Sequence, residues 1–144
     1  MSATADEALK LAPRVLLADD NPANRRLVDI ILSELGYRMT LVGDGREAVM
    51  AVNASAFNLV LMDLRMPGLD GFEAARRIRK LPYGRGDAPI VAVTADLRPR
   101  VEADVRAAGM NACLFKPFDI TSLTEIVAIW AGASPKLDSG ATGR

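Results

Sequence analysis

Residues 59–78 read LVLMDLRMPGLDGFEAARRI and join a strand, a loop and the start of a helix. The run before Asp63 is entirely apolar, which is typical of a strand buried on both faces of a parallel sheet. Asp70 and Glu73 have the spacing of a capping box at a helix start. We expect this helix to pack through three apolar residues, Phe72, Ala75 and Ile78. The segment therefore predicts one unit of an alternating α/β fold.

The same alternation recurs on both sides of this segment. Further apolar runs predict strands at Val15 to Asp19, Tyr37 to Val42, Ile90 to Val93 and Ala112 to Phe115. Helices are expected to begin at Asn21-Pro22, Asp44, Pro99 and Asp119, with Arg98 as the cap before Pro99, and to end at Gly36 and Gly109. The first helix is expected to pack through Leu27, Ile30, Ile31 and Leu35.

Strands separated by helices of this length predict right-handed βαβ crossovers. We expect a doubly wound α/β fold, in which five parallel strands are covered by helices on both faces. Ligands bind such sheets beyond the carboxyl ends of the strands. The chain has 144 residues, the size of one domain. We place this domain at 14–131, between an N-terminal extension (1–13) and a flexible C-terminal tail (132–144).

The composition excludes several classes of function. Lys plus Arg and Asp plus Glu both number 18, so the net charge does not favour nucleic acid or anionic lipid as a partner. There is no histidine, which excludes Ser-His and Cys-His catalysis and a phosphohistidine on these residues. A single cysteine, Cys113, excludes an internal disulfide and cysteine-based zinc sites. Because no signal peptide or membrane-spanning stretch is visible, we expect a cytoplasmic protein.

Five chemistry-bearing residues fall at the predicted strand ends: Asp19, Asp20, Asp63, Thr94 and Lys116. Three neighbouring carboxylates repel one another, by about 4 kcal/mol for each pair at about 4 Å and an effective dielectric constant of about 20. A hard divalent cation relieves this repulsion, and an open site of oxygen ligands suits Mg²⁺. A carboxylate nucleophile beside a cation, an ammonium and a hydroxyl suits an incoming phosphoryl group.

Four segments, DDNPAN, LVLMDLRMPGLDG, VAVTAD and GMNACLFKPF, resemble the signature segments of the response-regulator receiver domain of two-component signalling. The resemblance runs from Arg14 to Trp130 and is especially close to receivers of hybrid histidine kinases and to single-domain regulators. It implies the (βα)5, CheY-like variety of the doubly wound fold, with strand order 2-1-3-4-5.

The resemblance also implies residue roles at a magnesium site. Asp63 would be the phosphoacceptor. Asp20 and Asp63 would bind Mg²⁺ through their side chains, Arg65 through its backbone carbonyl, and Asp19 directly or through water.

Around the incoming group, the resemblance implies that Thr94 and Lys116 bind the phosphoryl oxygens. The peptide bond between Lys116 and Pro117 would be cis and would aim the ammonium into the site.

The sequence has unusual or variable residues near the predicted site. The family usually has Tyr or Phe three positions before the lysine, and this chain has Cys113 there, which puts the usual aromatic switch in doubt. Arg65 lies two residues after Asp63, and Asp96 two residues after Thr94. We expect both to flank the mouth of the site, where they could form an ion pair and slow hydrolysis of the acylphosphate.

The resulting hypothesis is a single-domain receiver that is phosphorylated by a sensor histidine kinase or a histidine phosphotransfer protein. It would signal through an unidentified downstream protein or onward phosphotransfer, as a monomer or a phosphorylation-dependent dimer, and would not be an enzyme in the usual sense. Residues 132–144 are too few for an output domain.

The alternatives are a degenerate receiver that acts only as an interaction module, and a dehalogenase-like phosphatase. The phosphatase needs an Asp where Arg65 stands. A nucleotide binder is disfavoured because no Gly-rich loop follows the first strand.

Overall fold

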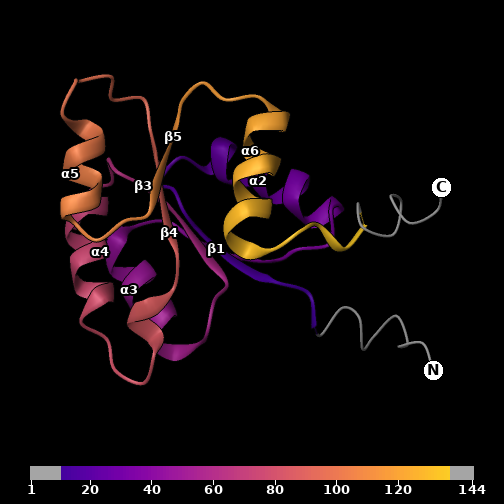
Figure 1. Cartoon of the computed structure of the whole chain (residues 1–144), viewed down its shortest axis with the longest axis horizontal. Coiled ribbons are helices and arrows are strands. Elements are labelled where there is room, and N and C mark those ends of the chain that lie inside the picture. The colour runs from indigo at the N-terminus through magenta and orange to yellow at the C-terminus, as the bar shows by residue number, and fades with distance from the viewer. Residues whose placement is uncertain (1–10, 137–144) are drawn as a thin grey trace.

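The computed structural model describes residues 11–136 as an α/β sandwich around one sheet (Figure 1). The five strands are β1 (Arg14–Ala18), β2 (Arg38–Val42), β3 (Leu59–Asp63), β4 (Ile90–Thr94) and β5 (Ala112–Phe115). All neighbouring strands run parallel, in the order β2-β1-β3-β4-β5. The predicted fold class and strand order are therefore confirmed.

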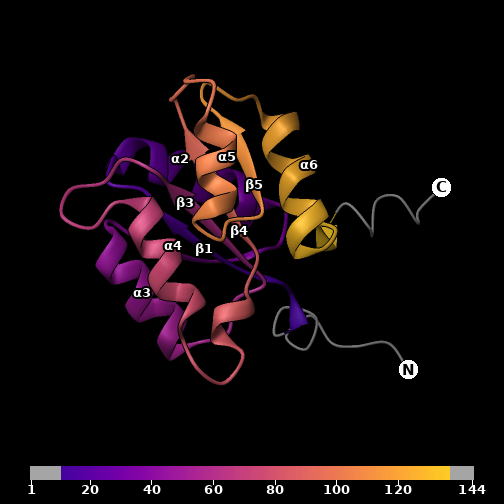
Figure 2. The ribbon, with the colours of Figure 1, turned by 60° about the vertical axis from the view of Figure 1, so that its left-hand side comes forward.

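Helices cover both faces of this sheet (Figure 1, Figure 2). They are α2 (Pro22–Glu34), α3 (Gly45–Ala54), α4 (Gly71–Arg79), α5 (Val101–Ala107) and α6 (Ile120–Ala131), with a 3-10 turn, η1, at Arg85–Asp87. One face carries α3, α4 and α5, and the other carries α2 and α6. Every residue of β3 and β4 is buried, because helices lie above and below these strands.

Each face has its own apolar core, because successive strand residues point to opposite sides. In β1, Leu16 packs toward α3, α4 and α5, whereas Leu17 packs toward α2 and α6. The α2 helix contributes Val28 and Leu32, both buried. The prediction was partly wrong here, since Leu27 is 57% exposed and Ile30 is 50% exposed. Apolar residues occupy more than one face of this helix, and packing on the sheet selects the face that contains Val28 and Leu32.

Most predicted helix starts are confirmed by their caps. Four N-cap side chains accept backbone N–H bonds in the first turn: Asn21, Asp44, Asp70 and Asp119. The start of α5 was predicted wrongly. Pro99 and Arg100 form a turn, the helix begins at Val101, and Arg100 rather than Arg98 is the N-cap residue. Among the described residues, no side chain caps this helix.

Residues 132–136 do not form the flexible tail that we expected. Gly132 accepts a hydrogen bond from the Tyr37 hydroxyl through its carbonyl (2.6 Å), and the buried Ser134 hydroxyl donates to the Leu35 carbonyl (2.6 Å). These bonds hold the segment after α6 against the corner between α2 and β2. The remainder of the predicted tail, 137–144, and residues 1–10 of the predicted extension lie outside the described residues. Within 11–136, no helix combines the length and apolar character needed to cross a bilayer.

Candidate functional site

Strand register brings the predicted site residues to one edge of the sheet. Ala18 pairs with Met62, so the residues that follow them, Asp19 and Asp63, stand side by side. On the other side of β3, Asp63 pairs with Val93, the residue before Thr94. Thr94 in turn pairs with Phe115, the residue before Lys116. The carboxyl ends of four strands therefore deliver one carboxylate, hydroxyl or ammonium each.

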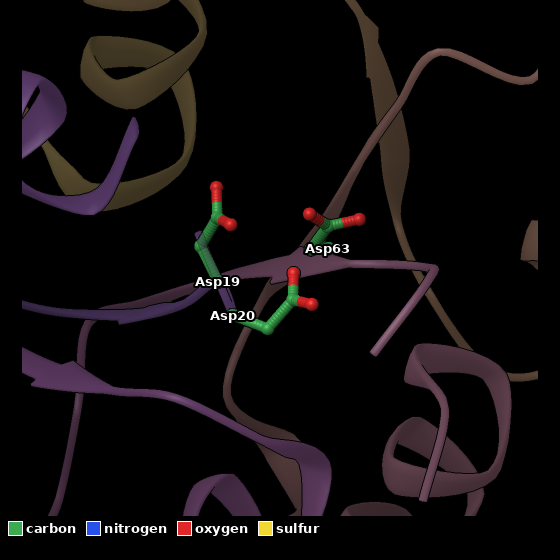
Figure 3. Close-up of side chains that lie close together, drawn as sticks. All are labelled: Asp19, Asp20 and Asp63. Atoms are coloured by element: carbon green, nitrogen blue, oxygen red, sulfur yellow. The ribbon is translucent and has the colours of Figure 1, made fainter. Parts of the chain in front are cut away.

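Three carboxylates converge at this edge (Figure 3). Asp19, Asp20 and Asp63 each offer a carboxylate oxygen, and these oxygens all lie within 4.8 Å of one another. Asp19 and Asp63 are buried, whereas Asp20 is exposed. Hard oxygen donors around an open position are what Mg²⁺ requires. The donor set therefore fits a divalent cation.

Asp63 is held by contacts on both carboxylate oxygens. Its Oδ1 accepts a hydrogen bond from the backbone N–H of Arg65 (3.0 Å), and its Oδ2 lies 3.0 Å from Nζ of Lys116. Gly71 packs against its backbone, since a Cβ at Gly71 would clash with the Asp63 carbonyl oxygen and lie 2.9 Å from Cα of Leu64. The first residue of α4 thus packs directly on the Asp63 backbone and limits where that backbone can lie.

Lys116 reaches the carboxylates from the loop after β5. Its Nζ also lies 3.7 Å from Oδ2 of Asp19, so the ammonium faces two of the three carboxylates. Its backbone N–H continues the β4–β5 ladder by donating to the Thr94 carbonyl (2.7 Å). The Lys116–Pro117 peptide bond is cis, as predicted.

The surroundings of Asp19 act on its carboxyl group in opposite directions. Burial raises the pKa of this carboxyl above its ordinary value, while the N–H of Asn21 and the ammonium of Lys116 act in the opposite direction. Oδ1 accepts the Asn21 N–H at 2.9 Å. The backbone carbonyl of Asp19 accepts a bond from Nη1 of Arg25 (2.7 Å). We did not predict this contact, and nothing in the sequence distinguishes Arg25 from its neighbour Arg26.

Thr94 closes the site from β4. It is 1% exposed, and its Oγ1 accepts the backbone N–H of Asp96 (3.0 Å). This bond leaves the hydroxyl hydrogen of Thr94 available as a donor.

Comparison with known proteins agrees with this geometry. The family model of the response regulator receiver domain matches residues 15–128 of this chain. The chain belongs to this family. The receiver domain is 42% identical over 123 residues to the sensor protein GacS of Pseudomonas syringae pv. syringae, covering 84% of this chain and 14% of GacS. It is 37% identical over 117 residues to the CAI-1 autoinducer sensor kinase/phosphatase CqsS of Vibrio cholerae, covering 81% of this chain and 17% of CqsS.

Solved receiver structures share its fold. The receiver domain of sensor histidine kinase PA1611 from Pseudomonas aeruginosa PAO1 is 41% identical, with a TM-score of 0.76, and the match covers 85% of this chain and 99% of that one. That structure has a magnesium ion coordinated in its active site cleft. The Saccharomyces cerevisiae complex of the phosphotransfer protein Ypd1 with the receiver domain of Ssk1 matches at 27% identity and a TM-score of 0.76, covering 83% and 89% of the two chains.

The mouth of the receiver site differs from our expectation at Asp96. The carboxylate of Asp96 pairs with Arg98, at 2.6 Å from Nη2 and 2.8 Å from Nε, and not with Arg65. Hydrogen bonds from Arg98 hold the pKa of Asp96 below its ordinary value. Arg65 is exposed, and both arginines line a surface cavity of about 530 Å³ together with Asp96. The backbone N–H of Arg98 also donates to Oδ1 of Asp96 (3.0 Å), so this is a local contact between residues two positions apart.

Cys113 lies in β5, away from the carboxylates. Its side chain is half-buried and lines a surface cavity of about 220 Å³ with Glu102 and Arg106 of α5. Burial raises the pKa of the thiol to about 11, with smaller contributions from Glu102 and Asp96. The thiol is therefore protonated and weakly nucleophilic at neutral pH.

Proposed function

We propose that this receiver domain accepts a phosphoryl group on Asp63 in a reaction that requires Mg²⁺. The observation that carries this proposal is the surroundings of Asp63. Its buried carboxylate has one oxygen 3.0 Å from an ammonium and belongs to a group of three carboxylates within 4.8 Å of one another. Repulsion among the three carboxylates would destabilise such a group, and a bound cation would relieve that repulsion. The group therefore supports a function that depends on a cation.

The residues that would hold Mg²⁺ are Asp19, Asp20 and Asp63, with the backbone carbonyl of Arg65 as a further ligand. When bound, the ion neutralises negative charge on the phosphoryl oxygens. The magnesium in the cleft of the PA1611 receiver domain, which is 41% identical, supports this assignment.

In the transfer itself, one carboxylate oxygen of Asp63 forms a bond to phosphorus while the bond from phosphorus to the donor's imidazole nitrogen breaks. The electron pair of that bond returns to the imidazole ring. Lys116 would pair with a phosphoryl oxygen in place of Asp63, and the Thr94 hydroxyl would donate to another; the 3.0 Å contact between Lys116 and Asp63 supports this role of the lysine. The product is an aspartyl phosphate, which water later hydrolyses.

The phosphodonor would be a sensor histidine kinase or a histidine phosphotransfer protein. The relatives GacS and CqsS are sensor proteins, and the Ssk1 receiver domain binds the phosphotransfer protein Ypd1, which supports this class of partner. We propose that the output is a phosphorylation-dependent protein contact or onward phosphotransfer, by a monomer or a phosphorylation-dependent dimer. A cytoplasmic location also stays a prediction.

The test is phosphorylation of the purified chain by a small phosphodonor in Mg²⁺, followed by intact mass. We expect one added phosphoryl group that hydroxylamine removes, as for an acylphosphate. The adduct should be absent in Asp63→Asn, because an amide cannot form an acylphosphate, and absent from the wild type in chelator.

Asp87→Asn is the matched control. Asp87 is an exposed carboxylate before β4, at the opposite edge of the sheet, and its variant should be phosphorylated like the wild type. An undiminished adduct in Asp63→Asn would exclude Asp63 as the acceptor. A folded wild type that acquires no adduct would favour the alternative, an interaction module independent of phosphorylation.

A further inference from the structure

The side chain of Arg25 links the first turn of α2 to the end of β1. Its Nη1 donates a hydrogen bond of 2.7 Å to the backbone carbonyl of Asp19. The same nitrogen lies against the end of β2, since a Cβ at Gly43 would be only 3.3 Å from it. Arg25 is half-buried, whereas the next residue, Arg26, is exposed. The guanidinium thus occupies the junction of β1, β2 and α2, against the backbone of Asp19.

This contact completes the hydrogen bonds of a strand end. The β1–β2 ladder pairs residues up to Ala18 and Val42, and the N–H of Asp19 adds one bond to the Val42 carbonyl (3.2 Å). Within residues 11–136, no strand supplies a donor for the Asp19 carbonyl, and the side chain of Arg25 supplies one. A charge-assisted bond of this length is among the stronger kinds in proteins.

Fixing this carbonyl also constrains the backbone from which two carboxylate side chains extend. The peptide group between Asp19 and Asp20 is planar, so holding its oxygen sets the orientation of the whole unit. The side chains of Asp19 and Asp20 leave from its two ends. Both must face Asp63 for their oxygens to approach within 4.8 Å.

We infer that Arg25 is a positioning residue of the cation site: its bond to the Asp19 carbonyl holds the Asp19 and Asp20 carboxylates toward Asp63. This inference rests on the proposed function. Groups that orient metal ligands contribute to metal affinity although they do not touch the metal.

A purely electrostatic role for Arg25 would have the opposite consequence. Its positive charge near the carboxylates opposes the binding of a second cation. Removing only that charge would therefore tighten Mg²⁺ binding. Removing a positioning contact weakens it, so the sign of the change distinguishes the two roles.

The experiment measures the Mg²⁺ dissociation constant by calorimetry for the wild type, Arg25→Ala, Arg25→Lys and Arg26→Ala. We expect roughly tenfold weaker binding in Arg25→Ala, the lower end of the range for residues that orient metal ligands. Arg26→Ala removes a neighbouring charge of the same helix and should bind within about twofold of the wild type. Arg25→Lys keeps the charge and one donor, and should fall between the wild type and Arg25→Ala.

Two further measurements separate positioning from general destabilisation. Without Mg²⁺, Arg25→Ala should shift the backbone amide resonances of Asp19 and Asp20 more than Arg26→Ala does. Phosphorylation of Arg25→Ala should recover at saturating Mg²⁺. If Arg25→Ala does not fold, Arg25→Lys carries the test, because weaker binding with the charge retained has no electrostatic explanation.

Unchanged or tighter Mg²⁺ binding in the folded Arg25 variants would overturn the inference and leave the proposed function intact. A folded wild type that binds no Mg²⁺ would instead refute the proposed function itself.

Discussion

Nζ of Lys116 lies 3.0 Å from Oδ2 of Asp63, although the two residues stand 53 positions apart in the sequence. The pair joins the ends of β3 and β5, two strands that are not neighbours in the sheet. The ammonium thus partly offsets the repulsion among the carboxylates before any phosphoryl group arrives. This arrangement predicts opposite effects of Lys116 on cation binding and on phosphoryl transfer.

Replacing Lys116 by Gln should slow phosphorylation of Asp63 by about 100-fold, because a charged group facing the transferred phosphoryl oxygens is lost. Mg²⁺ binding should become tighter, since one competing positive charge leaves the carboxylates. Phosphorylation rates at saturating Mg²⁺ and Mg²⁺ titrations check the two effects. A rate equal to that of the wild type would remove Lys116 from the transfer step.

Asp19→Asn should stabilise the protein in chelator at pH 7 by about 0.5–2 kcal/mol while it weakens Mg²⁺ binding. The raised pKa of Asp19 means that the folded state holds this proton more tightly than the unfolded chain does. The charged carboxyl therefore lowers the free energy of unfolding at neutral pH, and this cost disappears as the pH falls through the raised pKa.

Urea unfolding of both proteins at several pH values measures this effect. The advantage of Asp19→Asn should be largest near neutral pH and shrink on acidification. An advantage that grows as the pH falls would contradict the assignment.

Gly71→Ala should destabilise the domain by about 1–3 kcal/mol and slow phosphorylation, because the new Cβ would displace the Asp63 backbone. Gly68→Ala, in the loop that precedes α4, is the control. Gly68 has a positive φ of 76° but open space around it, so we expect a cost of about 1 kcal/mol without loss of phosphorylation. Thermal unfolding and adduct mass give both readouts, and equal phosphorylation defects would rule out a specific effect at Asp63.

The Asp96–Arg98 ion pair should act as a unit on the lifetime of the acylphosphate. We expect Asp96→Ala and Arg98→Ala to change the dephosphorylation rate non-additively, since each removes the same contact. The combination of Asp96→Ala with Arg65→Ala should be additive, because Arg65 is not the partner. The decay of the phosphorylated protein in a single turnover gives the dephosphorylation rate for the two double-mutant cycles, Asp96 with Arg98 and Asp96 with Arg65. Stronger coupling to Arg65 would mean that the loop rearranges on phosphorylation.

Phosphorylation should alter residues 94–104 more than the strand that contains Cys113. The α5 start at Arg100 has no side-chain cap, Leu97 in the preceding loop is 77% exposed, and Asp96 bonds to Thr94 and Arg98 of the same segment, so a change at Thr94 can remodel the loop. Cys113 is too small to replace the aromatic side chain that acts as the switch at this position in the family. Amide chemical shifts with and without a phosphoryl mimic test this. Changes centred on Cys113, with residues 95–104 unaffected, would refute it.

Local chemistry made much of this fold predictable. Apolar runs of four or five residues marked the central strands, and the capping side chains of Asn21, Asp44, Asp70 and Asp119 marked helix starts, because a cap acts within three residues of itself. The grouping of Asp19, Asp63, Thr94 and Lys116 was also predictable, since parallel strands end at one edge of their sheet. The resemblance to receiver domains supplied the strand order and the residue roles.

Only the tertiary structure decided which side of α2 is buried, because that helix is apolar on more than one side and its rotation depends on packing against the sheet. The local conformation of the loop after β4 pairs Asp96 with Arg98, two residues away, rather than with Arg65 from the loop after β3. Arg25 and Arg26 are equivalent in the sequence, yet only Arg25 reaches the Asp19 carbonyl. Long side chains acquire their partners from the relative placement of whole elements, which spacing along the chain does not determine.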